Sequence, residues 1–339
     1  MIMDETILLA HGGGGRLTGQ LVSELFVPAL DNPWLRTMSD AAVLPPLPAG
    51  RPALTTDGFV VDPLEFPGGD LGYLSVCGTV NDLAVAGAIP LWLTWALILE
   101  EGCSRELLTR LTAGAARAAG EAGVTIVAGD TKVVPRGKGD RAFAVTSGLG
   151  VVPPDRELGD ARVTPGDVLV SSGSLGDHGA VILACRHGMV LRDLVSDCSP
   201  VSDLVGLAFA SGAAIRVAHD PTRGGVATVC NEVALRARVG IELDEDAIHV
   251  REETRGVCDL LGLDPLYLAC EGRVIFFVAA DDAAGLVAAL RAHPNGCNAS
   301  VIGAVISRDR AMAPVVLRTA GRGVHPLDYL SGIELPRIC

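Results

Sequence analysis

Apolar runs of strand length alternate with helical runs rich in small residues, and this alternation constrains the fold more than any other feature of the chain. In the first half it predicts strands and helices joined by short connections. Ser104 precedes one helical run as an N-cap, and Gly123 follows it as a stop signal. The predicted strands are 52–61, 91–99, 124–129 and 141–152, and the predicted helices are 72–87 and 104–122.

The dipeptide Pro153-Pro154 interrupts this series and predicts a domain boundary. A second alternating series follows, and 339 residues are enough for two domains. We therefore predict an α+β protein with two α/β-sandwich domains, 1–152 and 153–325, and a mobile tail, 326–339. In the second series we expect strands at 167–172, 273–280 and 299–306, helices at 176–187, 201–218, 225–238 and 281–292, and a strand followed by an irregular tail over 314–339.

Charge and cysteine content exclude several classes of protein. A formal net charge of −13 argues against nucleic acid and anionic membranes as partners, and it means that a bound nucleotide would need Mg²⁺. The 9 cysteines form no CxxC pair, so we expect neither a zinc site nor a disulfide framework. The sequence also shows no basic leader and no apolar run of membrane-spanning length. These features predict a cytoplasmic protein with reduced thiols.

The last residue is a cysteine, Cys339, which follows Pro336, Arg337 and Ile338. A thiolate is a strong nucleophile, and at the end of a tether it could enter a pocket, carry a substrate covalently and leave again. An isolated terminal cysteine more often belongs to a frayed end. The nucleotide-site pattern upstream favours the functional interpretation in this chain.

Four aspartates stand at predicted strand ends beside small residues. Carboxylates in such positions can converge on Mg²⁺ ions that bridge triphosphate oxygens. One such aspartate alone is more often a turn residue, but four within one domain favour convergence. They match neither a Walker A loop nor a GxGxxG motif. The four are Asp40, Asp57, Asp82 and Asp130.

Two glycine-rich segments are candidate phosphate-binding loops. Residues 11–16 (HGGGGR) could wrap phosphates with backbone N–H groups or could form a flexible linker, and both interpretations stay open. Residues 220–225 (DPTRGG) precede a predicted helix whose N-terminus could bind an anion, although an ordinary loop-to-helix turn has the same pattern. Lys132 and Glu271, taken singly, look like surface charges.

Four segments together resemble one family: VNDLAVAGAIP at 80–90, GDTKVVPRG at 129–137, DPTRGG at 220–225 and PRIC at 336–339. Over essentially its whole length the chain is similar to the HypE family of carbamoyl dehydratases, which are hydrogenase maturation proteins. That family lies within the superfamily of aminoimidazole ribonucleotide synthetase and selenophosphate synthetase. The terminal PRIC is highly specific, whereas the Asp- and Gly-rich motifs alone indicate only the superfamily.

The resemblance implies an ATP-dependent dehydration on the Cys339 thiol. The carbamoyltransferase HypF would load the sulfur with a carbamoyl group, ATP would phosphorylate the carbamoyl oxygen, and loss of phosphate would leave a thiocyanate. The cyanide would then pass to iron on a HypC–HypD scaffold for [NiFe]-hydrogenase. By similarity, Glu271 would be the base or would position the carbamoyl nitrogen, and Lys132 would hold negative charge.

The same resemblance assigns the remaining binding residues and the assembly. It implies a homodimer in which the two N-terminal sheets form a barrel that removes open strand edges. Mg²⁺ and ATP would be held by Asp40, Asp57, Asp82 and Asp130, and further nucleotide contacts would come from Asn81, Thr131, Asp220 and Gly224.

Two other functions stay open. Asp40-Ala-Ala resembles the metal motif of thiamine-phosphate kinases, so a kinase or synthetase acting on a small metabolite would fit the same fold. A non-catalytic adaptor that docks its tail on a partner would also fit. The carbamoyl function predicts that a Cys339→Ala protein still binds ATP but makes no thiocyanate, whereas unchanged turnover of a free small molecule would favour the first alternative. Loss of water from a carbamoylated C-terminal peptide after ATP addition would exclude the second.

Overall fold

A computed structural model describes residues 6–190, 192–309, 313–319, 321, 323–330 and 337–339. The first domain is built on a four-stranded sheet in the order β1-β6-β4-β5. β6 pairs antiparallel with both β1 and β4, while β4 and β5 are parallel. The strands match the predicted alternation: β1 (Arg51–Phe59), β4 (Ile89–Glu100), β5 (Thr125–Val134) and β6 (Ala142–Val152).

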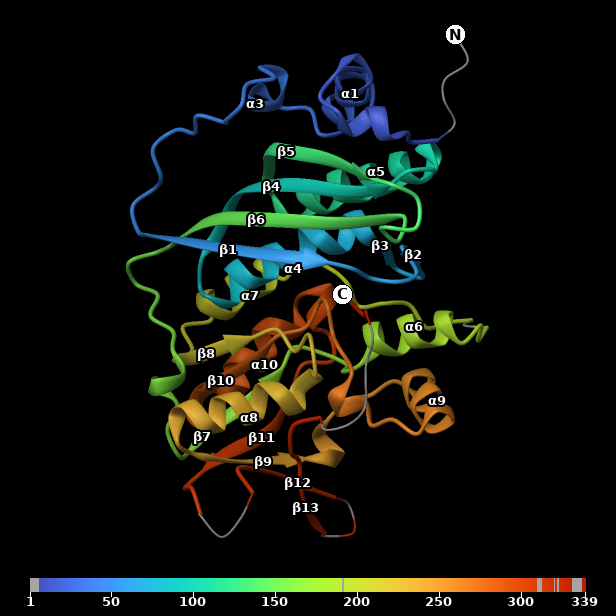
Figure 1. Cartoon of the computed structure of the whole chain (residues 1–339). Helices are drawn as coiled ribbons and strands as arrows, with labels where there is room; N and C mark the ends of the chain where they lie inside the picture. Colours follow the sequence, from blue (N-terminus) through green and yellow to red (C-terminus); the bar gives the residue numbers. More distant parts are fainter. Residues whose placement is uncertain (1–5, 191, 310–312, 320, 322, 331–336) are drawn as a thin grey trace.

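The helices α4 (Leu71–Val85) and α5 (Arg105–Ala122) cover one face of this sheet (Figure 1). The predicted limits of α5 are confirmed, because Ser104 Oγ accepts a hydrogen bond from the N–H of Leu107 at 3.3 Å and Gly123 takes a φ of 67°. Every residue of α4 except Asp82 is buried. This helix is enclosed because the sheet covers one side and the second domain packs on another.

The second domain contains a seven-stranded sheet in the order β13-β12-β9-β11-β7-β10-β8. Helices cover both faces of this sheet. On one face Phe277 of β10 packs in a hydrophobic cluster with α8, and on the other face Phe276 packs in a hydrophobic cluster with α7 and α10. The strands are β7 (Asp167–Ser171), β8 (Ile215–His219), β9 (Gly240–Asp244), β10 (Ile275–Ala279), β11 (Ser300–Ile306), β12 (Val315–Arg318) and β13 (Val324–Pro326). The helices are α6 (Asp177–Arg186), α7 (Ser202–Ala210), α8 (Gly225–Ala237), α9 (Glu252–Leu261) and α10 (Ala283–Arg291).

The prediction of a single helix over 201–218 is wrong. The helix α7 ends at Ala210, and Gly212, with a φ of 77°, turns the chain into β8. Apolar residues continue through this region, so the change of period from helix to strand is hard to see in the sequence. The elements β9 and α9 were not predicted either.

The N-terminal segment folds beside β5 (Figure 1). It forms one continuous helical stretch, α1 (Arg16–Leu21), η2 (Val22–Phe26) and α2 (Val27–Ala29), followed by α3 (Pro33–Arg36). The turn η1 (Leu9–Gly12) packs on β5 so closely that a Cβ on Gly12 would lie 2.6 Å from the Val133 nitrogen. The first part of the glycine-rich segment 11–16 is therefore packed against the first domain, while residues 13–16 are exposed.

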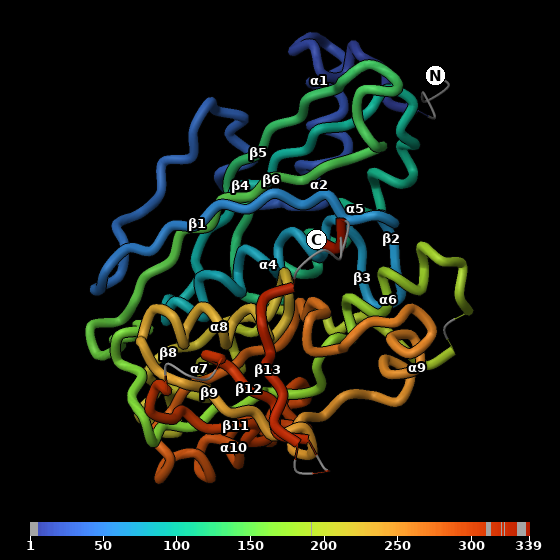
Figure 2. The backbone as a smooth tube through the Cα atoms, turned by 60° about the horizontal axis from the view of Figure 1, so that its bottom comes forward, coloured from blue at the N-terminus to red at the C-terminus, as the bar shows by residue number. Residues whose placement is uncertain are grey.

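The two domains meet at α4, and the C-terminal end of the chain reaches back into the seam between them (Figure 2). The predicted tail begins too early, because Leu327 is 4% exposed in the core of the second domain. Residues 331–336, Pro336 among them, lie outside the described part of the chain.

No helix among the described residues is long and apolar enough to cross a membrane. The short elements are β2 (Glu65–Phe66), β3 (Gly69–Asp70), η3 (Asp160–Arg162), η4 (Glu245–Ala247), η5 (Pro265–Tyr267), η6 (Ala280–Asp282) and η7 (Pro294–Gly296).

Candidate active site

A cavity of about 160 Å³ lies in the seam between the domains. Its walls come from β1, from α4, from the loop between β8 and α8, and from the segment before β10. Four carboxyl groups and a thiol from distant parts of the sequence meet there. We call it the acidic cavity; it is lined by Thr56, Asp57, Phe59, Gly78, Asp82, Asp220, Thr222, Arg223, Glu271 and Cys339.

The carboxyl groups of the acidic cavity are held in an environment that disfavours their charge. Burial raises the pKa of Asp57 and of Asp82. Burial, followed by the charge of Asp82, raises the pKa of Asp220 to about 7. Burial, followed by the charge of Asp220, raises the pKa of Glu271 well above its usual range. Such a cluster favours the uptake of a proton or of a cation.

The backbone of Glu271 is held by hydrogen bonds from both of its polar groups. Its backbone N–H donates to Asp197 Oδ1 at 3.2 Å, and its carbonyl oxygen accepts from Asn81 Nδ2 at 3.0 Å. The residue is 2% exposed, and its buried Oε1 has no hydrogen-bond partner within the described residues. A buried carboxyl group with a free oxygen suits proton transfer from a bound group.

The last residue of the chain enters the acidic cavity. The N–H of Val60 donates to a main-chain carboxylate oxygen of Cys339 at 3.2 Å, and the N–H of Asp62 donates to the carbonyl oxygen of Arg337 at 3.3 Å. Burial, followed by the charge of Glu271, raises the pKa of the Cys339 thiol to about 12. The seated sulfur is therefore protonated at neutral pH. Cys339 and Glu271, which were predicted to act together, line the same cavity.

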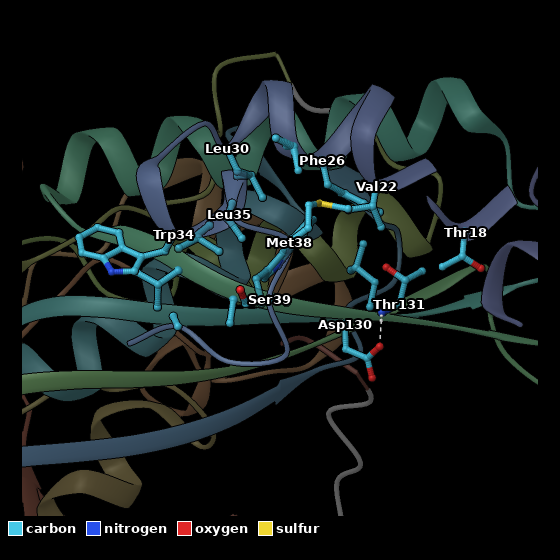
Figure 3. A pocket seen from close by; sticks show the side chains of 18 of the residues that line it. Thr18, Val22, Phe26, Leu30, Trp34, Leu35, Met38, Ser39, Asp130 and Thr131 are labelled. Atoms are coloured by element: carbon cyan, nitrogen blue, oxygen red, sulfur yellow. Dashed lines mark hydrogen bonds between the residues drawn. The ribbon is translucent and has the colours of Figure 1, made fainter. Parts of the chain in front are cut away.

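A larger pocket of about 310 Å³ lies beside β5 (Figure 3). Lys132 Nζ donates to Asp130 Oδ1 at 2.8 Å, and this hydrogen bond lowers the pKa of Asp130. The N–H of Thr131 donates to the same oxygen at 2.8 Å. We call it the apolar pocket: its walls are Val22, Phe26, Val27, Leu30, Trp34, Leu35, Met38, Trp95, Leu97, Ile126 and Val127, with Asp40, Asp130, Thr131 and Lys132 also lining it.

The four aspartates predicted to bind metal do not converge within one chain. Asp57 stands in a row with Thr146, Trp95 and Gly129 across the sheet, and Asp130 is the next residue along β5. Adjacent residues of a strand point to opposite faces, so Asp57 and Asp130 project from opposite faces, and three strand spacings separate their backbones by about 14 Å.

The sequence-predicted metal ligands are therefore divided between the two sites. Asp57 and Asp82 line the acidic cavity, whereas Asp40 and Asp130 line the apolar pocket together with Lys132. Lys132 and Glu271 are not brought together in a single chain. Among the residues that the structure describes, no three His, Cys, Asp or Glu side chains are placed to hold a metal ion.

Two residues that were predicted to bind the nucleotide, Asn81 and Gly224, have a structural role in the free chain. Asn81 is 1% exposed; its Nδ2 donates to the carbonyl oxygens of Ser199 and Glu271, and its Oδ1 accepts from the N–H of Val201. It therefore fastens α4 to the second domain. Gly224 takes a φ of 75° before α8, where a Cβ would lie 2.1 Å from Thr228 Oγ1. Neither residue lines the acidic cavity.

The sequence analysis assigned no role to three further residues at the site, Arg223, Arg337 and His178. Arg223 and Arg337 stand within the DPTRGG and PRIC motifs, so the motifs carried a signal for them. Arg337 Nε donates to the carbonyl oxygen of Val60 at 2.9 Å, and its guanidinium pairs with Asp140. His178 lies against the tail as well, but a single histidine within an apolar helix gives no signal of its own.

Comparisons with known proteins identify the two domains and the family. Residues 38–152 match the N-terminal domain model of AIR synthase related proteins, and residues 164–314 match the C-terminal domain model. The carbamoyl dehydratase HypE of Rhodobacter capsulatus is 48% identical over 342 aligned positions, which cover 100% of this chain and 99% of that protein.

Solved structures match over nearly the same length. A crystal structure of the hydrogenase maturation protein HypE in complex with ATP is 44% identical, has a TM-score of 0.94, and covers 98% of this chain and 100% of that one. HypE in a crystal structure of a HypE–HypF complex is 41% identical, with a TM-score of 0.79 and coverage of 91% and 99%. The chain therefore belongs to the carbamoyl dehydratase HypE family.

Proposed function

We propose that this chain dehydrates a carbamoyl group carried on Cys339 to a thiocyanate at the expense of ATP. The balanced reaction is R–S–CO–NH₂ + ATP → R–S–CN + ADP + phosphate, in which the carbamoyl oxygen leaves on the phosphate. The observation that carries the proposal is the presence of the terminal thiol and Glu271 in one enclosed cavity. A relative 44% identical to the chain was crystallised with ATP, which supports ATP as the phosphoryl donor.

The residues of the acidic cavity suit the steps of this reaction. A carbamoyl oxygen is a poor leaving group until it is phosphorylated, and the nitrogen must then lose two protons as the C–O bond breaks. Glu271, with its free buried oxygen, would accept a proton from the nitrogen in its ionised form, which a cation bound in the cavity would favour over the protonated form. The Arg223 guanidinium lines the cavity and would offset negative charge there.

Mg²⁺ and the phosphates of ATP fit the oxygen-rich walls of this site. The raised pKa values of Asp57 and Asp82 indicate carboxyl groups whose charge is not fully compensated by the protein, and oxygen is the ligand that Mg²⁺ prefers. Asp57 and Asp82 would hold the ion on one side, and Asp40 and Asp130 would hold it on the other. A bound Mg²⁺ would supply positive charge to the phosphate oxygens.

A homodimer would bring these two halves together. The sheet face from which Asp130 projects also carries Leu54, which is 77% exposed, and Val145, which is 39% exposed. Burial of such a face against a second copy would remove apolar surface from water and close the open strand edges. We therefore propose that Asp130 and Lys132 of one chain serve the acidic cavity of its partner. The apolar pocket would take the base of the nucleotide.

The partners follow from the same chemistry. The relative solved with HypF supports this carbamoyltransferase as the enzyme that loads Cys339. The cyanide would pass to iron on a HypC–HypD scaffold, in the cytoplasm, for the assembly of a [NiFe]-hydrogenase.

The test uses the C-terminal peptide as its own reporter. The chain is loaded with a carbamoyl group by its transferase, ATP and Mg²⁺ are added, and the peptide is weighed by mass spectrometry. We expect it to lose the mass of one water. Cys339→Ala should bind ATP but give no product, while Cys297→Ala, which changes an exposed cysteine, should behave as the parent. Turnover of a free small molecule by Cys339→Ala would instead favour the kinase alternative, and an absence of ATP hydrolysis would favour the adaptor.

A further inference from the structure

The docked tail is held by two different kinds of contact. At the rim, Arg337 pairs with Asp140 and lies over the ring of Phe143, both of which are accessible to solvent. Further in, Ile338 is 6% exposed and packs in a hydrophobic cluster formed by the first domain together with α6 and α9. The carbonyl oxygen of Ile338 is 2.8 Å from Nε2 of His178, and this contact is fully buried. The inner contact therefore sits between the rim and the sulfur of Cys339.

The hydrogen bonds around His178 fix its tautomer. A carbonyl oxygen only accepts hydrogen bonds, so Nε2 carries the proton and donates to Ile338. In the neutral ring Nδ1 is then an acceptor, and it lies 2.8 Å from Ser196 Oγ, which must donate its hydroxyl proton. Ser196 Oγ can do so because it accepts at the same time from the N–H of Cys198 at 3.0 Å. Each polar atom of this chain of contacts has a partner of the right kind.

The surroundings of His178 keep the ring neutral and immobile. The residue is 0% exposed, and the ring of Phe66 packs edge-on against the imidazole with centroids 5.4 Å apart. Burial lowers the pKa of His178 to about 4, and the hydrogen bond to Ile338 opposes this only in part. The donor at Nε2 is therefore present throughout the neutral pH range.

We propose that His178 is a positioning residue that holds the C-terminal tail in the seat from which Cys339 Sγ faces the acidic cavity. The benefit of this seat for catalysis rests on the proposed function, whereas the contacts that hold the tail do not. A buried carbonyl oxygen that loses its donor is costly, and so is a buried N–H that loses its acceptor. The pair thus favours the seated tail over the released one, while the accessible contacts of Arg337 add less.

The test measures seating directly, through the accessibility of individual thiols. The full-length protein is treated with iodoacetamide at pH 8, and each cysteine is quantified by peptide mass spectrometry. In the parent, Cys339 should react slowly because it is seated and protonated. The exposed Cys297 reports the reactivity of the reagent, and the fully buried Cys230 reports unfolding.

His178→Leu, which removes the donor, should label Cys339 at least about tenfold faster while leaving Cys297 and Cys230 unchanged. His178→Gln retains an amide N–H of similar reach and should restore slow labelling to within about threefold of the parent. Equal labelling of Cys339 in His178→Leu and the parent would overturn the proposal.

If His178→Leu also labels Cys230, that variant is unfolding, and the decision passes to His178→Gln and Ser196→Ala. Ser196→Ala keeps the imidazole but removes its orienting partner, and it should label Cys339 about threefold faster. Parent-like labelling in Ser196→Ala, together with fast labelling in His178→Gln, would overturn the proposal.

A second readout separates a positioning role from a general structural one. In His178→Leu, the single-turnover rate of thiocyanate formation should fall by the same factor as the seated fraction, while loading by the transferase should not fall. Failure of the proposed function would look different: labelling would follow these predictions, but no carbamoylated peptide would lose water.

Discussion

The acidic cavity and the apolar pocket differ in almost every physical property, although the first domain contributes walls to both. The acidic cavity is small, lies under β1 at the domain seam, and holds carboxyl groups whose pKa values are raised by burial. The apolar pocket is about twice as large, lies beside β5, and holds an aspartate whose pKa is lowered by a lysine. One is suited to proton and phosphoryl transfer, and the other to holding a larger body with an apolar face.

This difference indicates that reaction and binding are separated within a single chain. The carboxyl groups that we propose for Mg²⁺ and nucleotide binding are divided between two faces of one sheet. In the homodimer that we propose, the sites of the two chains would complete each other. It also yields experiments that act on one site and leave the other unchanged.

The largest expected effect is that of Glu271→Gln. Removal of a general base slows a proton transfer by about 100-fold to 10,000-fold, so the single-turnover rate of thiocyanate formation should fall by at least 100-fold. Binding of ATP should change little, because the apolar pocket is untouched. Rapid-quench mass spectrometry of the C-terminal peptide measures the rate, and the exposed Glu252→Gln serves as the matched control. A fall of less than tenfold would remove Glu271 from the mechanism.

A mixture of two inactive proteins should recover activity if each site uses both chains. Lys132→Ala and Cys339→Ala are each expected to be inactive. After random exchange of subunits, about half of the dimers are mixed, and each has one complete site, so about a quarter of the parent activity should return. If Lys132 acts on the cavity of its own chain, the mixture should remain inactive. Native mass spectrometry establishes the fraction of mixed dimers.

Asp220→Asn should stabilise the free protein at high pH. The pKa of Asp220 is raised from 3.8 to about 7 in the folded protein. The folded state therefore keeps a proton that the unfolded state loses, and the free energy of unfolding falls as the pH rises from about 4 through 7. Asparagine has no such loss, and the variant should gain up to about 4 kcal/mol at pH 8 relative to pH 4. Urea unfolding without Mg²⁺ or nucleotide measures this gain, with the exposed Asp259→Asn as control. A gain that does not depend on pH would contradict the assignment.

The smallest expected effect belongs to the apolar pocket. Trp34→Ala removes one aromatic wall and should raise the KM for ATP by about fivefold while leaving kcat nearly unchanged. Labelling of Cys339 by iodoacetamide should not change, because the tail is seated in the other site. An equal fall in kcat would show that the two sites are coupled more tightly than their positions indicate.

Much of the fold could be predicted from the sequence, because period and capping are local properties. The limits of α5 follow from Ser104 and Gly123, and the four strands of the first sheet follow from their apolar runs. The division of 201–218 into α7 and β8 could not be predicted, because the apolar residues continue across Gly212.

The candidate site was predictable only in its parts. The motifs indicated Cys339, Glu271 and the aspartates, but a sequence does not state on which face of a sheet a residue lies. The prediction that the four aspartates stand at strand ends is wrong, because Asp57 and Asp130 lie within β1 and β5, Asp82 lies in α4, and Asp40 precedes β1. Asp57 and Asp130 both follow small or polar residues, yet the register places them on opposite faces. His178 carried no signal, because its role depends on a carbonyl group 160 residues away.

The enclosure of α4 has a consequence for how the protein moves. Fourteen of its side chains or backbone positions are packed away from water, and Ala84 and Val85 belong to the hydrophobic cluster of the second domain. A helix shared in this way disfavours the opening of the two halves, since opening would expose a contiguous apolar surface. In the reaction that we propose, movement of the C-terminal residues would therefore cost less free energy than a clamshell motion of the domains.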